Sequence, residues 1–136
     1  MKVYIAGTFQ NREKLRPMKD SIWKLGHQCM SSWLDEVVKP SFLTTEEFRK
    51  KLAFKDCIEV CSSDLLILDT ESVSGGKNCE FALALRGYQN QLLWTVGQAT
   101  NIFQALTDRN FVDWEECLTY LECHYPTTKG SDANKI

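Results

Sequence analysis

Histidine is scarce in this sequence, and its scarcity argues against several kinds of catalytic site. The chain of 136 residues has two histidines, His27 and His124, and no Ser-His-Asp set can be recognised around either. Neither histidine stands at zinc-finger distance from a cysteine, and no two cysteines form a Cys-x-x-Cys pair. We therefore expect neither a histidine-based mechanism nor a metal site.

An excess of positive charge and a long apolar run are also missing. The formal net charge is −2, whereas a protein that binds nucleic acid through its phosphates normally has a basic excess. No apolar run approaches the roughly 18 residues that a membrane-spanning helix needs. The first residues enter a strand-like run directly, without the apolar segment of a signal peptide. We expect a cytoplasmic protein with neither a nucleic-acid nor a membrane partner.

The two common glycine-rich phosphate motifs, GxxxxGK[ST] and GxGxxG, are absent, and we expect no cofactor. The stretch Ser72–Lys77 (Ser-Val-Ser-Gly-Gly-Lys) nevertheless precedes a predicted helix, where free backbone N–H groups favour anions. Ser74, Gly75 and Gly76 could bind a phosphate or carboxylate there. A tight turn whose glycines have no ligand is the alternative.

Six cysteines are present, but a disulfide framework does not fit a chain with 43% hydrophobic residues, which can bury a core without one. We expect buried, reduced thiols in a reducing compartment. The cysteines are Cys29, Cys57, Cys61, Cys79, Cys117 and Cys123.

Strand-like and helix-like segments alternate along the chain, which predicts a single α/β domain over residues 1–125. Strands are expected at 3–6, 28–34, 64–69, 92–96 and 111–112, and helices at 12–25, 45–61, 78–86, 101–106 and 114–121. This alternation is typical of a doubly wound, flavodoxin-like sheet of five parallel strands in the order 2-1-3-4-5, with helices on both faces. The polar tail, residues 126–136, is expected to be mobile.

In a sheet of this order a ligand crevice forms where the first and third strands part. Gly7, Thr8 and Phe9 follow the first strand, and Asp69 ends the third, so all four are candidates for substrate contact. Phe9 and Trp33 could stack on a planar base, although both would be equally ordinary as core aromatics.

Glu80 is the most informative residue, because it is a lone carboxylate that opens the apolar helical run Phe81–Leu85. Burying a carboxylate without a partner costs several kcal/mol, so a sequence that does so usually has a use for the group. The alternative is an acid at a helix N-terminus that the helix dipole favours by about 0.3–1 kcal/mol.

A second acid, Asp56, lies in one i, i+4 row with Phe48, Leu52 and Val60. Its carboxylate therefore shares a face that should pack inward, although a salt bridge at the edge of the row is an equal alternative. Tyr4, in the first strand, is either a core aromatic or a phenol that pairs with a carboxylate in the crevice.

Taken together, several segments of the chain resemble the nucleoside 2-deoxyribosyltransferase superfamily, which includes 2′-deoxynucleoside 5′-monophosphate N-glycosidases. The resemblance runs from Val3 to about Leu121 and depends on the order and spacing of the segments rather than on any one of them. The segments are Val3–Phe9, Gly26–Leu34, Lys55–Asp56 with Ser63–Asp64, Gly75–Glu80, Val96–Phe103 and Phe111–Glu116.

The resemblance implies an enzyme that cleaves or transfers at the N-glycosidic bond of a nucleoside or nucleotide. Glu80 matches the family's nucleophile, which attacks the anomeric carbon and forms a glycosyl-enzyme ester. Asp56 matches an aspartate that assists the departing base, and Tyr4 a tyrosine that orients the nucleophile. The family also implies a homo-oligomer in which a neighbouring subunit completes the site.

The two branches of the family differ at positions where this chain is mixed. Six residues before the glutamate the transferases have aspartate, whereas the monophosphate glycosidases have a serine that contacts the 5′-phosphate; this chain has Ser74. At a later position the transferases have asparagine and the glycosidases serine, and the matching residue is Asn101. The chain also has Glu80-Phe-Ala82 where the family has Glu-Leu-Gly.

Two hypotheses of different class therefore remain from the sequence. One is an enzyme of the N-glycosidic bond, and the other is a non-catalytic nucleotide-binding module on the same fold. The presence of Tyr4, Asp56 and Glu80 together favours the enzyme, because a binding module need not keep a nucleophile.

Overall fold

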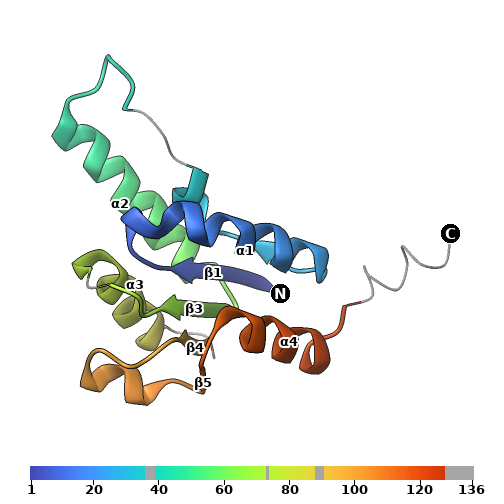
Figure 1. Ribbon diagram of the computed structural model, residues 1–136. Helices are drawn as coiled ribbons and strands as arrows, with labels where there is room; N and C mark the ends of the chain where they lie inside the picture. Colours follow the sequence, from blue (N-terminus) through green and yellow to red (C-terminus); the bar gives the residue numbers. More distant parts are fainter. Residues whose placement is uncertain (36–38, 73, 88–90, 128–136) are drawn as a thin grey trace, which may run out of the picture.

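A single sheet of five parallel strands organises the protein (Figure 1). The computed structural model describes residues 1–35, 39–72, 74–87 and 91–127. The strands are β1 (Lys2–Ala6), β2 (Gln28–Cys29), β3 (Leu65–Asp69), β4 (Leu92–Val96) and β5 (Arg109–Phe111). The α-helices are α1 (Arg12–Lys24), α2 (Thr45–Cys61), α3 (Gly75–Leu85) and α4 (Trp114–His124), and the 3-10 helices are η1 (Phe9–Asn11), η2 (Ser32–Asp35) and η3 (Ile102–Leu106).

The strand order is β2-β1-β3-β4-β5 with every pair parallel, which confirms the predicted doubly wound topology. β1 and β3 lie side by side, with Tyr4 opposite Leu66 and Ala6 opposite Leu68. The chain leaves these two strands for opposite sides of the sheet, since β1 leads to α1 and β3 leads to α3. The carboxyl ends of β1 and β3 therefore border the predicted crevice.

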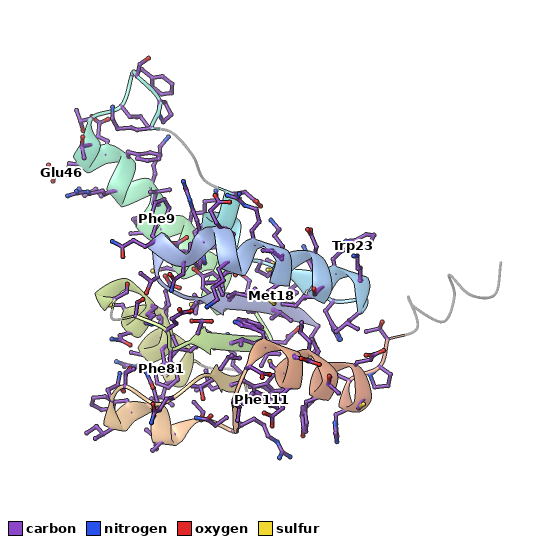
Figure 2. All side chains as sticks on the ribbon, viewed as in Figure 1. Phe9, Met18, Trp23, Glu46, Phe81 and Phe111 are labelled. Atoms are coloured by element: carbon purple, nitrogen blue, oxygen red, sulfur yellow. The ribbon has the colours of Figure 1, made fainter. Side chains whose placement is uncertain are left out.

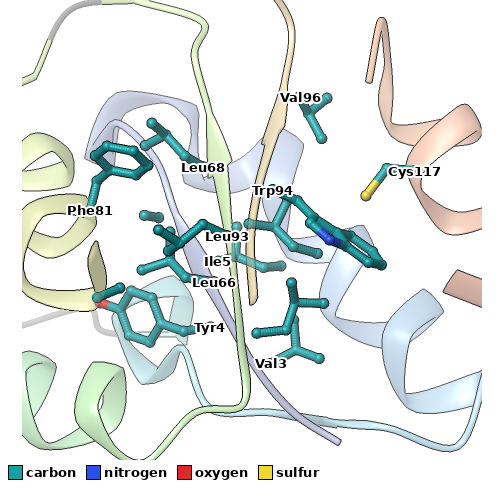
Figure 3. Close-up of a cluster of buried hydrophobic side chains, with 14 of the residues drawn as sticks. Val3, Tyr4, Ile5, Leu66, Leu68, Phe81, Leu93, Trp94, Val96 and Cys117 are labelled. Carbon is teal, nitrogen blue, oxygen red and sulfur yellow. The ribbon is translucent and has the colours of Figure 1, made fainter. Parts of the chain in front are cut away.

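The two faces of the sheet carry different helices. Figure 3 shows Tyr4, Leu66 and Leu68 on the face toward Phe81 of α3, and Trp94 on the face toward Cys117 of α4. α2 contacts α3, and α1 contacts α4, so each face is covered by one pair of helices. All five residues of β3 are buried, as expected for a central parallel strand covered on both faces.

The second predicted strand is much shorter than expected. β2 consists of Gln28 and Cys29, and residues 32–35 form η2 instead. Side chains replace the strand ladder here: Ser31 Oγ accepts from Ile5 N (2.5 Å) and donates to Ile5 O (3.1 Å), and Trp33 Nε1 donates to Ile5 O (2.8 Å). With Ile5 satisfied in this way, the chain has no need to continue as a strand beside it.

The helix that carries Glu80 begins at Gly75 rather than at residue 78 as predicted. Ser74 is its N-cap, and the two glycines belong to its first turn instead of to a loop. Glu80 is therefore in the second turn, where the helix dipole no longer accounts for an acid, since that effect fades within the first turn.

The remaining boundaries differ modestly from prediction, because β5 covers Arg109–Phe111 and α4 extends to His124. α2 begins with a capping box, in which the Thr44 side chain accepts from Glu47 N and the Glu47 side chain accepts from Thr44 N. No helix in the described ranges is both long and apolar enough to cross a membrane. The predicted tail lies outside the described residues from residue 128 onward.

The expectation of buried thiols is wrong for most cysteines. All six are free, but Cys57, Cys61, Cys79 and Cys123 are exposed, and Cys117 is the buried one. Three of the four exposed thiols, Cys57, Cys61 and Cys79, lie on α2 and α3, each of which has one side facing away from the sheet. Sequence composition could not place them because burial depends on which side of a helix meets the sheet.

Candidate active site

Three of the predicted residues come together on the α2–α3 face of the sheet. Tyr4 is fully buried in the middle of β1, Asp56 is half-buried in the last part of α2, and Glu80 is half-buried in α3. The charges of both carboxyl groups act on the pKa of the Tyr4 phenol. The sequence pattern had suggested an inward face for each acid, and the structure brings both acids to the same phenol.

Glu80 holds its proton far more tightly than an ordinary glutamate. Its pKa is raised to about 8, chiefly by burial; the Tyr4 phenol opposes this rise, and the nearby charges of Asp56 and Glu59 add to it. Burial dominates because a carboxylate loses its hydration in an apolar site. Such a shift is typical of functional carboxyl groups, which are buried where chemistry requires them.

The Tyr4 phenol also responds to the site. Burial raises its pKa well above the usual value, and the charges of Glu80 and Asp56 add to the rise. The phenol is close enough to Glu80 for the two groups to perturb each other, although neither the Tyr4 hydroxyl nor Glu80 Oε2 completes a hydrogen bond of normal geometry among the described residues. Two buried polar oxygens that lack a completed hydrogen bond are unusual in a folded core, and they indicate a functional site.

A third acid, Glu59, belongs to the same neighbourhood and was not identified from the sequence. Its charge raises the pKa of both Tyr4 and Glu80. Glu59 Oε1 also accepts from Ser32 Oγ (2.9 Å) and Ser32 N (3.3 Å), which fixes α2 to η2. The only feature of the sequence that could have identified Glu59 as a site residue was its position about one helical turn after Asp56 on α2. That spacing between acids is common on solvent-facing helices.

The N-terminus of α3 presents the predicted anion site. Ser74 is half-buried and makes no side-chain capping bond, and Gly75 and Gly76 are exposed beside it. A Cβ added at Gly75 would meet nothing within 4 Å, so the glycine leaves the helix end open. Backbone N–H groups at such an end are available to an anion. Contact of these residues with substrate stays a prediction.

Asn101 lies next to this helix. It is the N-cap of η3, where its Oδ1 accepts from Phe103 N (3.0 Å), and its Nδ2 donates to Asn78 Oδ1 of α3 (3.5 Å). Asn101 thus fixes η3 against α3 within the same subunit. Its predicted contact with substrate has no counterpart among these bonds and stays a prediction.

The residues after β1 occupy different environments. Gly7 is packed tightly, since an added Cβ would lie 2.5 Å from Leu15 Cδ1. Trp33 is buried with 6% exposure, whereas Phe9 is 55% exposed with the Arg12 guanidinium over its ring. Trp33 therefore belongs to the hydrophobic core, whereas Phe9 is exposed at the start of η1 (Figure 2). Contact of either ring with substrate stays a prediction. Thr8 is buried, and its Oγ1 donates to Glu71 O (3.4 Å).

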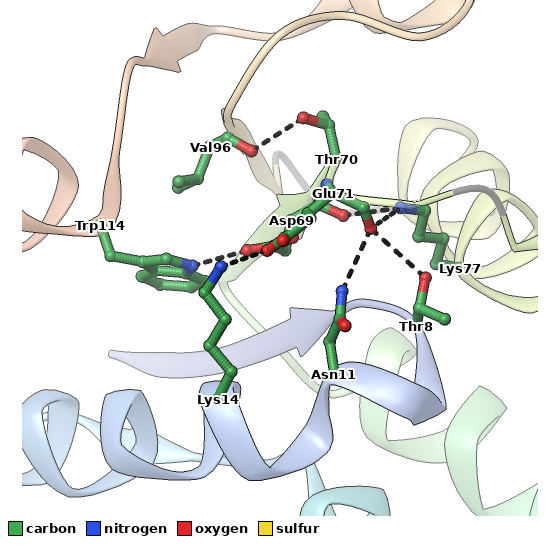
Figure 4. Close-up of polar contacts among 9 residues, drawn as sticks. All are labelled: Thr8, Asn11, Lys14, Asp69, Thr70, Glu71, Lys77, Val96 and Trp114. Atoms are coloured by element: carbon green, nitrogen blue, oxygen red, sulfur yellow. Dashed lines mark hydrogen bonds and ion pairs between the residues drawn. The ribbon is translucent and has the colours of Figure 1, made fainter.

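Asp69 is on the opposite side of the sheet from Tyr4. Tyr4 pairs with Leu66, so Asp69, three residues farther along β3, points to the other face. There its Oδ2 accepts from Trp114 Nε1 (2.7 Å) and its Oδ1 accepts from Glu71 N (3.0 Å), as Figure 4 shows. The structure does not bring Asp69 together with the three acids, and it ties Asp69 to α4.

Lys77 was named in the sequence only as part of the glycine-rich stretch, yet it is 1% exposed. Its Nζ donates to the carbonyl of Asp69, which ends β3, and to two carbonyls of the turn that follows, as Figure 4 shows in part. No sequence signal distinguishes it from a solvent-facing lysine. Among the described residues no group of three or more His, Cys, Asp or Glu side chains is arranged to hold a metal ion.

Two solved structures are similar to this fold over most of its length. One is a 2-deoxyribosyltransferase from the psychrotolerant bacterium Bacillus psychrosaccharolyticus, with a TM-score of 0.70, 17% identity, and coverage of 88% of this chain and 92% of the other. The other is a CMP N-glycosidase from Clostridium botulinum, with a TM-score of 0.56, 17% identity, and coverage of 91% and 100%. No family model matches the sequence, and no curated protein matches it. The chain therefore has the fold of these two enzymes, as the resemblance in its sequence predicted.

Proposed function

We propose that this protein cleaves or transfers at the N-glycosidic bond of a nucleoside or its 5′-monophosphate, with Glu80 as the nucleophile. The observation that carries the proposal is the burial of Glu80 beside Tyr4, with the charges of Asp56 and Glu59 close enough to act on it. A carboxyl group whose pKa is raised to about 8 is expensive to ionise, so its burial at this position indicates a functional use. The two similar structures, both of enzymes that act on such compounds, support the same activity.

The reaction divides into two steps in this proposal. A carboxylate oxygen of Glu80 attacks C1′ of the sugar, the bond from C1′ to the base nitrogen breaks, and the base leaves with that electron pair and a proton from Asp56. Water or a second base then attacks C1′ of the glycosyl ester, gives its proton to Asp56, and releases Glu80 as a carboxylate.

This order of steps requires that two carboxyl groups share one proton, with Glu80 ionised and Asp56 protonated when substrate is bound. The two charges already influence each other, because the charge of Asp56 raises the pKa of Glu80. Two neighbouring acids do not ionise together readily, so the pair holds a proton at neutral pH. The Tyr4 phenol lowers the pKa of Glu80 and therefore favours the arrangement in which Glu80 is the ionised member.

For the substrate, we propose a 5′-monophosphate over a free nucleoside. Ser74 has no capping bond to make, and with Gly75 and Gly76 it stands at the open N-terminus of α3. A helix N-terminus with free N–H groups and a free hydroxyl suits a phosphate. Asn101 matches the transferase branch instead, but it is engaged in capping η3 and in contact with Asn78.

We further propose that the protein is a homo-oligomer whose neighbouring subunit completes the site. Large apolar side chains are exposed on two elements of this region, namely Phe54 and Ile58 on α2 and Ile102, Phe103 and Leu106 on η3. Exposed apolar groups of this number usually mark an interaction surface. Light scattering of the purified protein should give at least twice the monomer mass, and a monomer mass at assay concentration would contradict this part of the proposal.

The test of the function is a panel of nucleosides and 5′-monophosphates incubated with the protein and scored for free base, with and without a second base as acceptor. Base release above that of a matched Glu80→Gln preparation, which controls for contaminating enzymes, is expected for at least one compound. Binding without any base release would instead favour a non-catalytic nucleotide-binding module.

A further inference from the structure

Lys77 is a buried cation whose role is not explained by the reaction proposed above. It is the third residue of α3 and is 1% exposed, so its four-carbon chain and its ammonium group are both inside the protein. Burial lowers its pKa, and the charges of Asp69 and Glu71 oppose this effect. Removing an ammonium group from water is costly, and an apolar side chain would fill the same space without that cost. The structure must therefore use the ammonium group itself.

The ammonium group is surrounded by backbone oxygens. Nζ donates to the carbonyl of Asp69 (3.0 Å), of Glu71 (3.0 Å) and of Ser72 (2.5 Å). An ammonium has three N–H donors, so these three acceptors use all of them. Three carbonyl oxygens that converge on one point repel one another, and a cation at that point is what allows the turn to adopt this shape.

The turn held in this way, residues 70–72, has other bonds at its start: Thr70 N and Oγ1 donate to Val96 O (3.0 Å each), and Glu71 N donates to Asp69 Oδ1 (3.0 Å). At Ser72 the bond from Lys77 holds the carbonyl that ends the turn. Ser72 has a φ of 66°, a left-handed conformation that a serine adopts at a cost. Two further donors reach Glu71 O from the segment after β1, Thr8 Oγ1 and Asn11 Nδ2, each at the long distance of 3.4 Å. Figure 4 shows Thr8, Asn11 and Lys77 converging on this carbonyl.

The position of Lys77 connects this turn to the candidate active site. Ser74 lies three residues before Lys77 and Glu80 three residues after it, and both are spaced at about one helical turn. A bond from the first turn of α3 back to the end of β3 fixes where the helix begins relative to the sheet. It therefore fixes the place of Ser74 at the helix N-terminus and of Glu80 beside Tyr4.

We propose that Lys77 is a positioning residue of the active site. Its three hydrogen bonds to carbonyl oxygens hold the end of β3 and the turn that follows, and so fix the position of α3 and Glu80 relative to the sheet. The catalytic consequence of this proposal rests on the proposed function, but the three hydrogen bonds from Lys77 are a property of the fold alone. The residue itself does not contact the substrate. A displacement of reacting groups by about 1 Å can cost roughly 100-fold in rate, which sets the scale of the expected effect.

The test compares Lys77→Met, which keeps the length of the side chain but removes all three donors, with Lys14→Met as the matched control. Lys14 also contacts this turn, through an ion pair of its Nζ with the Glu71 carboxylate, but its side chain is 65% exposed. Amide hydrogen exchange should become at least about tenfold faster in residues 70–72 and 74–79 of Lys77→Met, with β1 and β3 unchanged. Lys14→Met should exchange like the wild type.

Kinetics then separate positioning from simple stabilisation. At a temperature where the variant is fully folded, Lys77→Met should lose about 100-fold in kcat at saturating substrate. A folded variant with the wild-type kcat, or with wild-type exchange in the turn, would overturn the proposal. If Lys77→Met does not fold, Lys77→Gln, which keeps two of the donors, takes its place under the same criteria. A wild type that releases no base would refute the proposed function, while the exchange result would still decide whether Lys77 holds the turn.

Discussion

Tyr4 in β1 and Glu80 in α3 act on each other's proton affinity across the interface between the sheet and the helix. Burial and the charge of Glu80 both raise the pKa of the phenol, while the phenol lowers the pKa of Glu80 against the larger effect of burial. The phenol therefore stays protonated and is suited to stabilise the carboxylate form of Glu80 by hydrogen bonding. This relationship gives Tyr4 an orienting role without any transfer of its own proton.

The activity should depend on pH through Glu80. Because burial raises its pKa to about 8, the pair formed by Glu80 and Asp56 holds one proton at neutral pH and loses it above about pH 8. We expect kcat/KM to fall as pH rises through about 8, because Asp56 then has no proton to give to the departing base. In Tyr4→Phe the inflection should move upward, because the phenol lowers the pKa of Glu80. A profile without an inflection between about pH 6 and 9 would contradict this assignment.

The same shift predicts how stability changes with pH. The folded protein binds a proton at Glu80 more tightly than the unfolded chain, whose glutamate has a pKa of about 4.5. The contribution of Glu80 to stability is therefore fully present below about pH 4.5 and is lost as pH rises through about 8, with a slope of up to about 1.4 kcal/mol per pH unit. Urea unfolding at several pH values should show Glu80→Gln gaining stability relative to wild type as pH rises from 5 toward 8.

The matched control for that experiment is Glu122→Gln, which removes an exposed glutamate of α4. Its stability should follow that of the wild type at every pH. If Glu80→Gln also runs parallel to the wild type, Glu80 is not the buried, proton-holding group described above.

Asp56→Asn should slow the departure of the base. General acid catalysis contributes about 10²–10⁴-fold, and a base that leaves readily needs less of it. The loss in kcat should therefore be smaller for a substrate with a good leaving group than for one with a poor leaving group. Equal losses on both would assign Asp56 to holding α2 in place instead of to proton transfer.

Ser74→Ala tests the choice of substrate. A hydrogen bond to a charged group contributes about 1.5–3 kcal/mol, so kcat/KM for a monophosphate should fall roughly ten- to a hundredfold while that for the nucleoside changes little. The measurement is the ratio of the two kcat/KM values in wild type and variant. An unchanged ratio would remove Ser74 from the phosphate site and favour a nucleoside as the natural substrate.

Much of this fold follows from the sequence because its elements alternate and parallel strands restrict the connections between them. The run Leu65–Asp69 identifies a buried central strand, and right-handed crossovers then leave few orders for five strands. The second strand was mispredicted because Ser31 and Trp33 bond to Ile5 through their side chains. Such bonds depend on tertiary neighbours, which a pattern of residue types does not contain.

The site shows a similar division. Glu80 and Asp56 could be identified because each interrupts an apolar pattern, but Glu59 and Lys77 could not, since their burial depends on how α2 meets η2 and how the turn after β3 folds back. Asp69 could have been placed more accurately. Its position in β3 has the opposite parity to Leu66, which pairs with Tyr4, so strand alternation alone would assign it to the other face.

The central claim is that a sugar becomes bonded to Glu80 during turnover. The most direct measurement is peptide mass spectrometry of protein that has been mixed with the best substrate of the panel and denatured in acid within the first turnover. We predict an added glycosyl mass on the peptide that contains Glu80, absent from Glu80→Gln, which should also lose several orders of magnitude in rate. Base release by Glu80→Gln at a rate near that of the wild type, or a glycosyl group on another residue, would contradict the account.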